Sequence, residues 1–320
     1  MNEKLFVGVD VSKSHLDVHI HPISKKIRVE NSELGIALLV KRLSSFGTNV
    51  SQIVCEASGG YEVFMKNILH AAGYNVWSVN PRRVKAFIES EGVLVKTDPS
   101  DARMIAMFAA KKQCSYQPYV STPVDQELCG AIKRRFDLIE MVKGEKMRLQ
   151  SPLYKNEKKG IKAIIKFLEK QIQKYDDKID KLIQENKVWK RKTQIIESIP
   201  GVGRITSIVL LSSMPELGTI SHKKAAALLG VAPYTKESGV YKGVSKIRGG
   251  RPEARRVVYM AALSASRSNP VFIKFYKKLK KSGKKSKVAL VAVMRKLIVM
   301  INAMIEKDKE WNQELHNVVA

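Results

Sequence analysis

The sequence predicts three regions in order: a mixed α/β domain over residues 1–125, a helical coiled-coil segment over 126–192 and a mainly α-helical domain over 193–320. In the first region, short β-branched-rich segments alternate with helix-like ones. In the second, an unbroken heptad of apolar residues indicates a long helix. In the third, apolar residues recur at helical spacing around Gly-rich turns.

Three short strands open the chain, joined by the turn-like segments DVSKSH and HPISKK. A helix capped by Asn31-Ser32 follows and runs to about Phe46. The resulting order, β-β-β-α-β-α-β-α, predicts a mixed sheet with helices packed over it. The predicted strands are residues 5–11, 15–21, 26–29, 52–55 and 75–79, and the later helices are residues 61–72 and a segment after Pro81.

The helical segment carries a strict heptad seam between charged residues. Its apolar positions are spaced by four and three residues, which favours a helical hairpin or coiled coil over an amphipathic helix lying on its own domain. Such a segment joins domains or protomers. The seam residues are Ile161, Ile165, Leu168, Ile172, Tyr175, Ile179 and Leu182.

In the last region, Pro200-Gly201-Val202-Gly203 separates two helical patterns. A helix-hairpin-helix has this form, in which Gly201 and Gly203 let the backbone approach a phosphate; the alternative is a structural turn. Residues 233–252 are rich in Gly, Ser and Lys and predict a loop or hairpin. Two closing helices are predicted at 253–267 and 286–307, with the exposed basic stretch KFYKKLKKSGKKSK between them.

The net charge of +27 points to a polyanionic partner, nucleic acid first and an anionic membrane surface second. Residues 1–150 hold 21 Lys+Arg and 16 Asp+Glu, a net charge of +5, which leaves 36 and 14, a net of +22, for residues 151–320. Residues 151–320 should therefore bind the polyanion more strongly than residues 1–150.

Cysteine usage and hydropathy predict a cytoplasmic protein without a membrane partner, and a DNA partner would associate it with the nucleoid. Cys55, Cys114 and Cys129 are too few for a disulfide framework or a zinc site. No targeting signal opens the chain. The longest apolar run, residues 288–294, is far shorter than the ~20 residues of a membrane span.

Four carboxylates predict a metal site in the first region. Asp10 lies inside an apolar strand, where a carboxylate is costly unless it binds a cation or finds a partner. Glu56 ends a later strand, and Asp98 and Asp101 open a helix over 102–111. Alone, Asp98 is an ordinary helix cap and Asp101 a favourable charge at a helix start. Together, the four suit Mg²⁺, with Mn²⁺ as the alternative, in the pattern that ribonuclease-H-like nucleases require.

Sequence motifs resemble the insertion-sequence transposases of the one-ten family. GVDVSK around Asp10, CEASGGYE around Glu56 and KTDPSDA around Asp98 resemble its DEDD domain, which is similar to the RuvC Holliday-junction resolvase. IPGVG, LLGVAPYTKESGVYKG, the Ile247–Gly250 segment, Arg255 and RKL at 295–297 resemble its C-terminal domain. The pilin-gene invertases belong to the same family, so the resemblance covers both transposition and inversion.

The resemblance implies a recombinase guided by an element-encoded bridge RNA that pairs with double-stranded target and donor DNA. Asp10, Glu56, Asp98 and Asp101 would hold Mg²⁺ near the scissile phosphate. Ser238 would attack that phosphate, form a 5′-phosphoserine link and lead to a Holliday junction. The active site would join the DEDD domain of one protomer to the serine domain of another, in a homo-oligomer between dimer and tetramer.

The residues around Ser238 fit phosphate chemistry but leave rival nucleophiles. Tyr234 and Tyr241 lie in the same loop, and the family resemblance, not the spacing, favours Ser238. Glu62 follows Glu56 by six positions and leaves the assignment of the second ligand open. Basic residues would stabilise a pentavalent phosphorus or bind nucleic acid: Lys236, Lys242, Lys246, Arg248, Arg251, Arg255 and Arg256.

Two other functions remain open. A metal-dependent junction nuclease that uses water would need the carboxylates but not Ser238. A non-enzymatic nucleic-acid-binding protein would need neither, and its carboxylates would be structural. The position of Asp10 inside an apolar strand argues against this last reading.

Overall fold

The computed structural model describes residues 4–92, 98–112, 122–235, 237–238, 241–242 and 245–313, and no side chains at 48, 98–100, 237–238 and 241–242. The chain forms two compact units, Met1–Ser121 and Thr122–Ala320. Each is described by itself.

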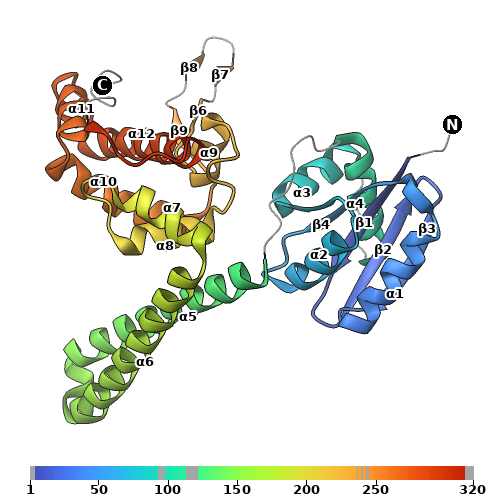
Figure 1. Cartoon of the computed structure of the whole chain (residues 1–320), viewed down its shortest axis with the longest axis horizontal. Coiled ribbons are helices and arrows are strands. Elements are labelled where there is room, and N and C mark those ends of the chain that lie inside the picture. The colour runs from blue at the N-terminus through green and yellow to red at the C-terminus, as the bar shows by residue number, and fades with distance from the viewer. Residues whose placement is uncertain are drawn as a thin grey trace. The chain divides into compact units, whose positions relative to one another are not determined.

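The first unit has the predicted element order around a five-stranded sheet (Figure 1). The strands are ordered β3-β2-β1-β4-β5. The first three are antiparallel, and β4 and β5 run parallel to β1. A mixed α/β domain is therefore confirmed. The elements are β1 (Leu5–Val11), β2 (His15–His21), β3 (Lys25–Glu30), α1 (Glu33–Ser44), a 3₁₀ turn (Gly47–Asn49), β4 (Val50–Glu56), α2 (Tyr61–Ala71), β5 (Val76–Val79), α3 (Pro81–Ser90) and α4 (Asp98–Lys112).

Helices cover both faces of the sheet and give this unit three layers. Odd-numbered residues of β1, such as Val7 and Val9, pack with α1 and α2. Phe6, on the other face of β1, packs in a cluster with residues of α3 and α4. This division follows from the two-residue alternation of a strand. It places the even-numbered positions of β1, including Asp10, on the α3–α4 face.

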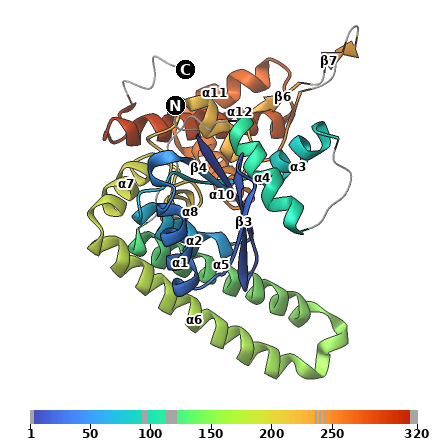
Figure 2. The same ribbon diagram turned by 90° about the vertical axis from the view of Figure 1, so that its right-hand side faces the viewer.

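The second unit begins with a helical hairpin, α5 (Pro123–Gln150) and α6 (Lys158–Glu185), joined by a 3₁₀ turn (Pro152–Glu157). Figure 2 shows the two helices running side by side. Thr122 and Asp125 form a capping box at the start of α5. Near the turn, the heptad seam of α6 packs against Leu138 and Val142 of α5.

Five more described helices complete the second unit around the apolar helix α12 (Ser286–Glu306). Among the described helices, α12 alone is long and apolar enough to cross a membrane by length and composition. Val293, Leu297 and Ile301 are nevertheless fully buried against the other helices, which makes α12 the core helix of this unit. The others are α7 (Lys187–Glu197), α8 (Arg204–Ser213), α9 (His222–Leu229), α10 (Pro252–Ser268) and α11 (Pro270–Lys281).

Helix α11 occupies much of the segment that the sequence analysis treats as an exposed basic stretch. Asn269 caps it and Pro270 occupies its first turn. Val271 and Phe272 are fully buried. The many lysines hide this helix in the sequence because only its first turn is strongly apolar.

Candidate active site and nucleic-acid interface

The register of the sheet brings Asp10 and Glu56 side by side. In the parallel pair of β1 and β4, Val9 lies opposite Cys55, so the next residues, Asp10 and Glu56, share one level. Such residues point to the same face, and neighbouring strands are about 4.8 Å apart. Both residues are half-buried. The sheet therefore brings together two of the four predicted metal ligands.

Helix α4 crosses the same face at Gly8. A Cβ atom on Gly8 would overlap the backbone of Ala102 and Ala106, so only glycine allows this approach. Gly8 and Asp10 are two residues apart on one strand and share a face. Asp101, which precedes Ala102, therefore belongs to the part of α4 that crosses β1 beside Asp10. Asp98 begins the same helix, and its side chain lies outside the described residues.

The donor chemistry fits a hard cation, although the described ligand set is partial. Asp10, Glu56 and Asp101 offer only carboxylate oxygens, the donors that suit Mg²⁺ and Mn²⁺. Within the described residues, no group of three or more His, Cys, Asp and Glu side chains is placed to hold a metal ion. The four-carboxylate site therefore stays a prediction, and the side chain of its fourth member, Asp98, lies outside the described residues.

Asp17, which the sequence analysis does not single out, stands beside Asp10. The two residues pair directly across the β1–β2 ladder. Like charges in this position destabilise a sheet, and Arg28 offsets the repulsion because its Nε lies 3.3 Å from the Asp17 carboxylate. The alternation in HLDVHIH places Asp17 on the polar face of β2, but only the register reveals its neighbour.

Glu62 has a structural role in the loop after β4. It is buried, and its Oε2 accepts hydrogen bonds from the backbone N–H of Gly60 at 2.9 Å and from the N–H and hydroxyl of Ser58, both at 3.2 Å. These three hydrogen bonds to the Glu62 carboxylate stabilise the turn between β4 and α2. Glu56 is thus the better candidate for the second metal ligand.

Buried titratable groups near the sheet are poor candidates for chemistry. Burial raises the pKa of the Cys55 thiol to about 12, and a thiol that stays protonated is neither a nucleophile nor a metal ligand. Burial also lowers the pKa of His19, and Arg103 adds to the effect. His19 is therefore held neutral. The pKa of Cys129, in the second unit, is raised to about 11, again by burial.

The segment that contains Ser238 forms an arm, which we define as residues 233–247. At its base β6 (Pro233–Tyr234) pairs with β9 (Lys246–Ile247), and farther out β7 (Glu237–Ser238) pairs with β8 (Tyr241–Lys242). In Figure 1 these strands extend from the helices of the unit. The predicted loop or hairpin is therefore an antiparallel hairpin with Ser238 opposite Tyr241, although both of their side chains lie outside the described residues.

Two glycine segments cross at the root of the arm. Gly230, which ends α9, and Gly250 have φ values of 77° and 76°, a region that favours glycine. A Cβ on either would overlap the backbone of the opposite segment. Arg255 donates from Nη1 to the Gly249 carbonyl at 2.6 Å. The crossing and this hydrogen bond fix the point from which the arm leaves the helical core.

Two of the predicted nucleic-acid-binding arginines also have carboxylate partners inside the unit. Arg251 donates to both carboxylate oxygens of Glu216 at 2.7 Å. Arg256 donates to Glu140 at 3.0 Å and so joins α10 to α5. These contacts give Arg251 and Arg256 roles in packing.

The cations along the arm differ from these arginines in their exposure. Lys246 and Arg248 are exposed. Tyr234 has half of its side chain exposed at the base of the arm. The side chain of Lys242 and the whole of Lys236 lie outside the described residues. Lys246 and Arg248 are therefore the described cations best placed to meet a phosphate near the arm.

The two glycines of the turn between α7 and α8 have different surroundings. Gly201 has a φ of 91°, and a Cβ there would lie 2.7 Å from the backbone of Ala265 in α10. Its lack of a side chain therefore serves packing. Gly203 is the N-cap residue directly before α8, and a Cβ there would meet no described atom within 4 Å. Of the two, Gly203 has the open surroundings that a phosphate contact requires.

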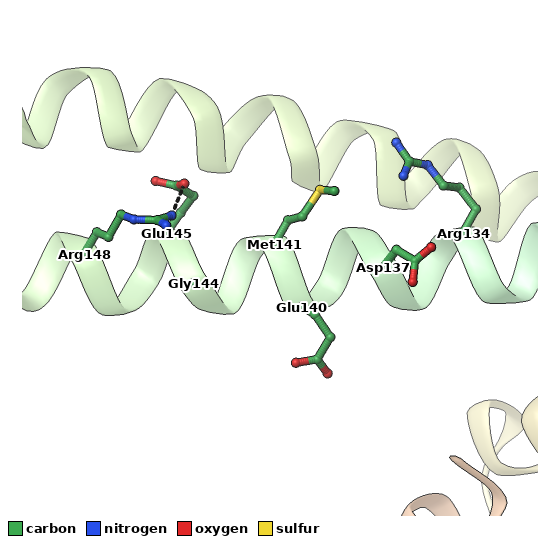
Figure 3. A pocket seen from close by; sticks show the side chains of 7 residues that line it. All are labelled: Arg134, Asp137, Glu140, Met141, Gly144, Glu145 and Arg148. Atoms are coloured by element: carbon green, nitrogen blue, oxygen red, sulfur yellow. Dashed lines mark hydrogen bonds and ion pairs between the residues drawn. The ribbon is translucent and has the colours of Figure 1, made fainter. Parts of the chain in front are cut away.

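The second unit has two surface hollows that are lined by residues of its own helices. One lies along α5, and all seven residues that line it belong to this helix (Figure 3). Arg148 and Glu145 form an ion pair there at 2.5 Å. The other lies between α5, α8 and α10 and is lined by Cys129 and Arg251 among others.

Comparison with known proteins gives consistent matches along the chain. Residues 7–155 match the family model DEDD_Tnp_IS110, described as a transposase, and residues 193–277 match the model of the IS116/IS110/IS902 transposase family. Pilin gene-inverting proteins of Moraxella bovis and Moraxella lacunata are each 26% identical over 322 residues, covering 98% of this chain and 99% of the relative. An uncharacterized 42 kDa protein of the insertion element IS900 from Mycobacterium paratuberculosis is 28% identical over 150 residues, 45% of this chain and 37% of that protein.

Proposed function

The chain belongs to the IS110 family of transposases, whose members cut and rejoin DNA, and from this premise we propose that it is a recombinase that cleaves double-stranded DNA through a 5′-phosphoserine intermediate. The observation that carries the proposal is the placement of Ser238 on an arm that extends from the helical core. A nucleophile on such an arm can reach a phosphate that the core does not touch.

The placement of the predicted carboxylate ligands supports a ribonuclease-H-like, RuvC-like role for the first unit. Asp10 and Glu56 lie at one level of adjacent strands, and Asp101 lies on the helix that crosses them. We propose that these residues and Asp98 hold Mg²⁺. When bound, Mg²⁺ supplies charge stabilisation at the phosphoryl oxygens.

In the proposed cleavage step, the Ser238 hydroxyl oxygen forms a bond to phosphorus and the bond from phosphorus to the 3′ oxygen breaks. The proton of the serine hydroxyl is transferred overall to the departing 3′ oxygen, which leaves as a hydroxyl group. The products are a 5′-phosphoserine link and a free 3′ end. Lys246, at the base of the arm, and Arg248, directly after it, are exposed and would stabilise the charge that develops on the phosphate.

We also propose the partners that the family resemblance implies. An element-encoded guide RNA would pair with target and donor DNA, and the exchange would pass through a Holliday junction in a homo-oligomer in the cytoplasm. The net charge of +22 over residues 151–320 supports the binding of more than one polyanion. Gly203, at the open start of α8, is the phosphate contact that we propose for a helix-hairpin-helix.

DNA inversion is the second candidate function. The matches to the two pilin gene-inverting proteins span nearly the full length of this chain and of each relative. Inversion and transposition use the same cutting and joining chemistry on differently arranged sites. The two functions therefore share the proposed site residues.

Trapping a covalent protein–DNA adduct on a nicked duplex tests the proposed chemistry. The parent protein should form an adduct that survives denaturing electrophoresis and breaks down in alkali, as a phosphoserine does and a phosphotyrosine does not. Ser238→Ala should form none, whereas Tyr234→Phe and Tyr241→Phe should still form it. Adduct from Ser238→Ala, or cleavage by the parent without any adduct, would contradict the assignment and favour a tyrosine or a water nucleophile.

Arg255→Ala should slow adduct formation while leaving DNA binding nearly unchanged, because Arg255 fixes the root of the arm. A lost charge-assisted hydrogen bond costs roughly 1.5–3 kcal/mol, so we expect at least about a tenfold lower rate at saturating duplex. A direct phosphate contact would instead weaken binding and reduce the salt slope by about one.

A rescue variant distinguishes positioning of the arm by Arg255 from direct contact of Arg255 with a phosphate. The hydroxyls of Thr235 and Ser245 lie 3.1 Å apart across the arm, so Thr235→Cys with Ser245→Cys can form a disulfide that stiffens it. In the Arg255→Ala background this disulfide should restore part of the rate, and reduction should remove the gain. Equal rates in the parent and in Arg255→Ala would rule out the positioning role.

A further inference from the structure

The corner between α11 and α12 holds a concentration of uncompensated charge. Residues 254–305 contain thirteen Lys and Arg and no Asp or Glu. Eight of these are lysines within fourteen residues, at the end of α11, the turn and the start of α12, and we name them the corner lysines. They are Lys274, Lys277, Lys278, Lys280, Lys281, Lys284, Lys285 and Lys287.

All eight corner lysines are exposed. Within the described part of the chain, none of them takes part in an ion pair. The i,i+4 spacing of Lys274 with Lys278, and of Lys277 with Lys281, places like charges next to each other on α11, which destabilises a helix. A polyanion removes this repulsion when it binds.

Three of the four arginines that the sequence analysis assigns to nucleic acid have partners within the protein, and only Arg248 does not share this placement among the described contacts. Arg251 and Arg256 bind carboxylates of the protein, and Arg255 binds a backbone carbonyl. The unit therefore uses these arginines to hold its own elements together. The corner lysines remain available to a partner.

The aromatic side chains of α11 favour a duplex over a single strand. Phe272 is fully buried and stacks on Trp311, with ring centroids 5.9 Å apart. Phe275 and Tyr276 pack against the core. Proteins that bind single strands usually present exposed aromatic rings on which bases stack, whereas lysines alone bind the phosphate backbone without reading bases.

We propose that the corner lysines form a phosphate-binding surface for double-stranded DNA, separate from the arm that presents Ser238. The choice of DNA as the partner rests on the proposed function. The surface would bind without sequence preference and would account for a large share of the salt dependence of binding. The uncapped start of α12 adds its partial positive charge at the same corner.

The test compares two variants with the same change in charge. The corner variant replaces Lys277, Lys278, Lys281 and Lys284 with glutamine in the full chain. The control replaces four exposed lysines of α6, a helix whose lysines alternate with Glu169, Asp176, Asp177, Asp180 and Glu185. The control positions are Lys162, Lys166, Lys170 and Lys174.

Duplex binding is measured by fluorescence anisotropy between about 0.05 and 0.2 M salt. For the corner variant we expect the slope of log K against log salt to fall by about 3 to 4 units, since each phosphate contact contributes about 0.9. We expect its affinity for duplex to fall at least about tenfold in this salt range, and that of the control to change less than about threefold. Circular dichroism and thermal melting verify that both variants fold.

Three outcomes would overturn the proposal: a corner variant that binds duplex like the parent, a control that loses as much affinity, or a loss confined to single strands of the same sequence. Binding is measured without divalent metal and in the Ser238→Ala background, so it does not depend on cleavage. A failed adduct experiment would therefore reject the serine chemistry without affecting the proposal for the corner lysines. Unchanged duplex binding by the corner variant would reject the corner surface without affecting the serine chemistry.

Discussion

Asp10→Asn is expected to abolish strand cleavage, with a rate reduction of about 10³-fold or more, because it removes a charged ligand from the proposed metal site. Metal stabilisation of a transition state is worth several kcal/mol, and about 1.4 kcal/mol corresponds to a tenfold change in rate. The measurement is adduct formation at saturating duplex with added Mg²⁺. Duplex affinity should stay within about twofold, since the cations of the second unit provide most of it.

A binding measurement distinguishes loss of the metal from loss of structure. In the parent protein, Mg²⁺ should raise the melting temperature of the first unit, because a ligand that binds only the folded state stabilises it. Asp10→Asn should lose this shift and still melt cooperatively. The matched control is Glu33→Gln, the same change in charge at the exposed first residue of α1. Unchanged cleavage, or an undiminished Mg²⁺ shift in Asp10→Asn, would refute the ligand assignment.

Gly8→Ala should destabilise the first unit by about 2 kcal/mol or more, although alanine ordinarily favours a strand over glycine by about 0.5–1 kcal/mol. The sign reverses because the new methyl group would overlap the backbone of α4 at Ala102 and Ala106, and overpacking typically costs about 1–3 kcal/mol. Because α4 holds Asp98 and Asp101, its displacement should also weaken Mg²⁺ binding. Hydrogen exchange of the β1 amides measures the stability change.

Gly130→Ala provides a control that should change the free energy of unfolding in the opposite direction. Gly130 lies in α5, is exposed and has no described atom within 4 Å of an added Cβ. Alanine there should stabilise the second unit by about 0.5–1 kcal/mol, the difference in helix propensity. If Gly8→Ala were as harmless as Gly130→Ala, the close approach of α4 to β1 would not be the feature that places Asp101.

The order of elements was predictable from local pattern, whereas the neighbours of each site residue were not. Alternation and capping predict the strands and helices of the first unit, since they depend on adjacent residues. That Asp17 lies opposite Asp10 depends on the register of two strands, and a shift of one residue would move it to the other face. The tight contact at Gly8 is likewise invisible until α4 is packed.

The partners of the basic residues were equally impossible to predict from local sequence pattern. Their number predicts a polyanion partner, but the sequence does not show which cations the protein uses internally. Arg251 has the same formal charge as Lys284, yet Glu216 holds Arg251 and no ion pair holds Lys284 within the described residues. Partners distant in the chain decide this difference. The helix α11 was missed for a related reason, because its capping and buried first turn are brief signals beside a run of lysines.

The core of the second unit joins the two ends of its chain, since Leu128 of α5 packs in the same cluster as Met300 and Met304 of α12. Such contacts form only after residues 300–304 have left the ribosome, whereas all elements of the first unit lie within Met1–Ser121 and are made much earlier. The first unit should therefore fold during synthesis, and the unit that contains Ser238 only at its end. If the proposed mechanism holds, a partly made chain would carry the proposed Mg²⁺ ligands without an organised Ser238, so it would not form the proposed phosphoserine link with the DNA beside which it is made.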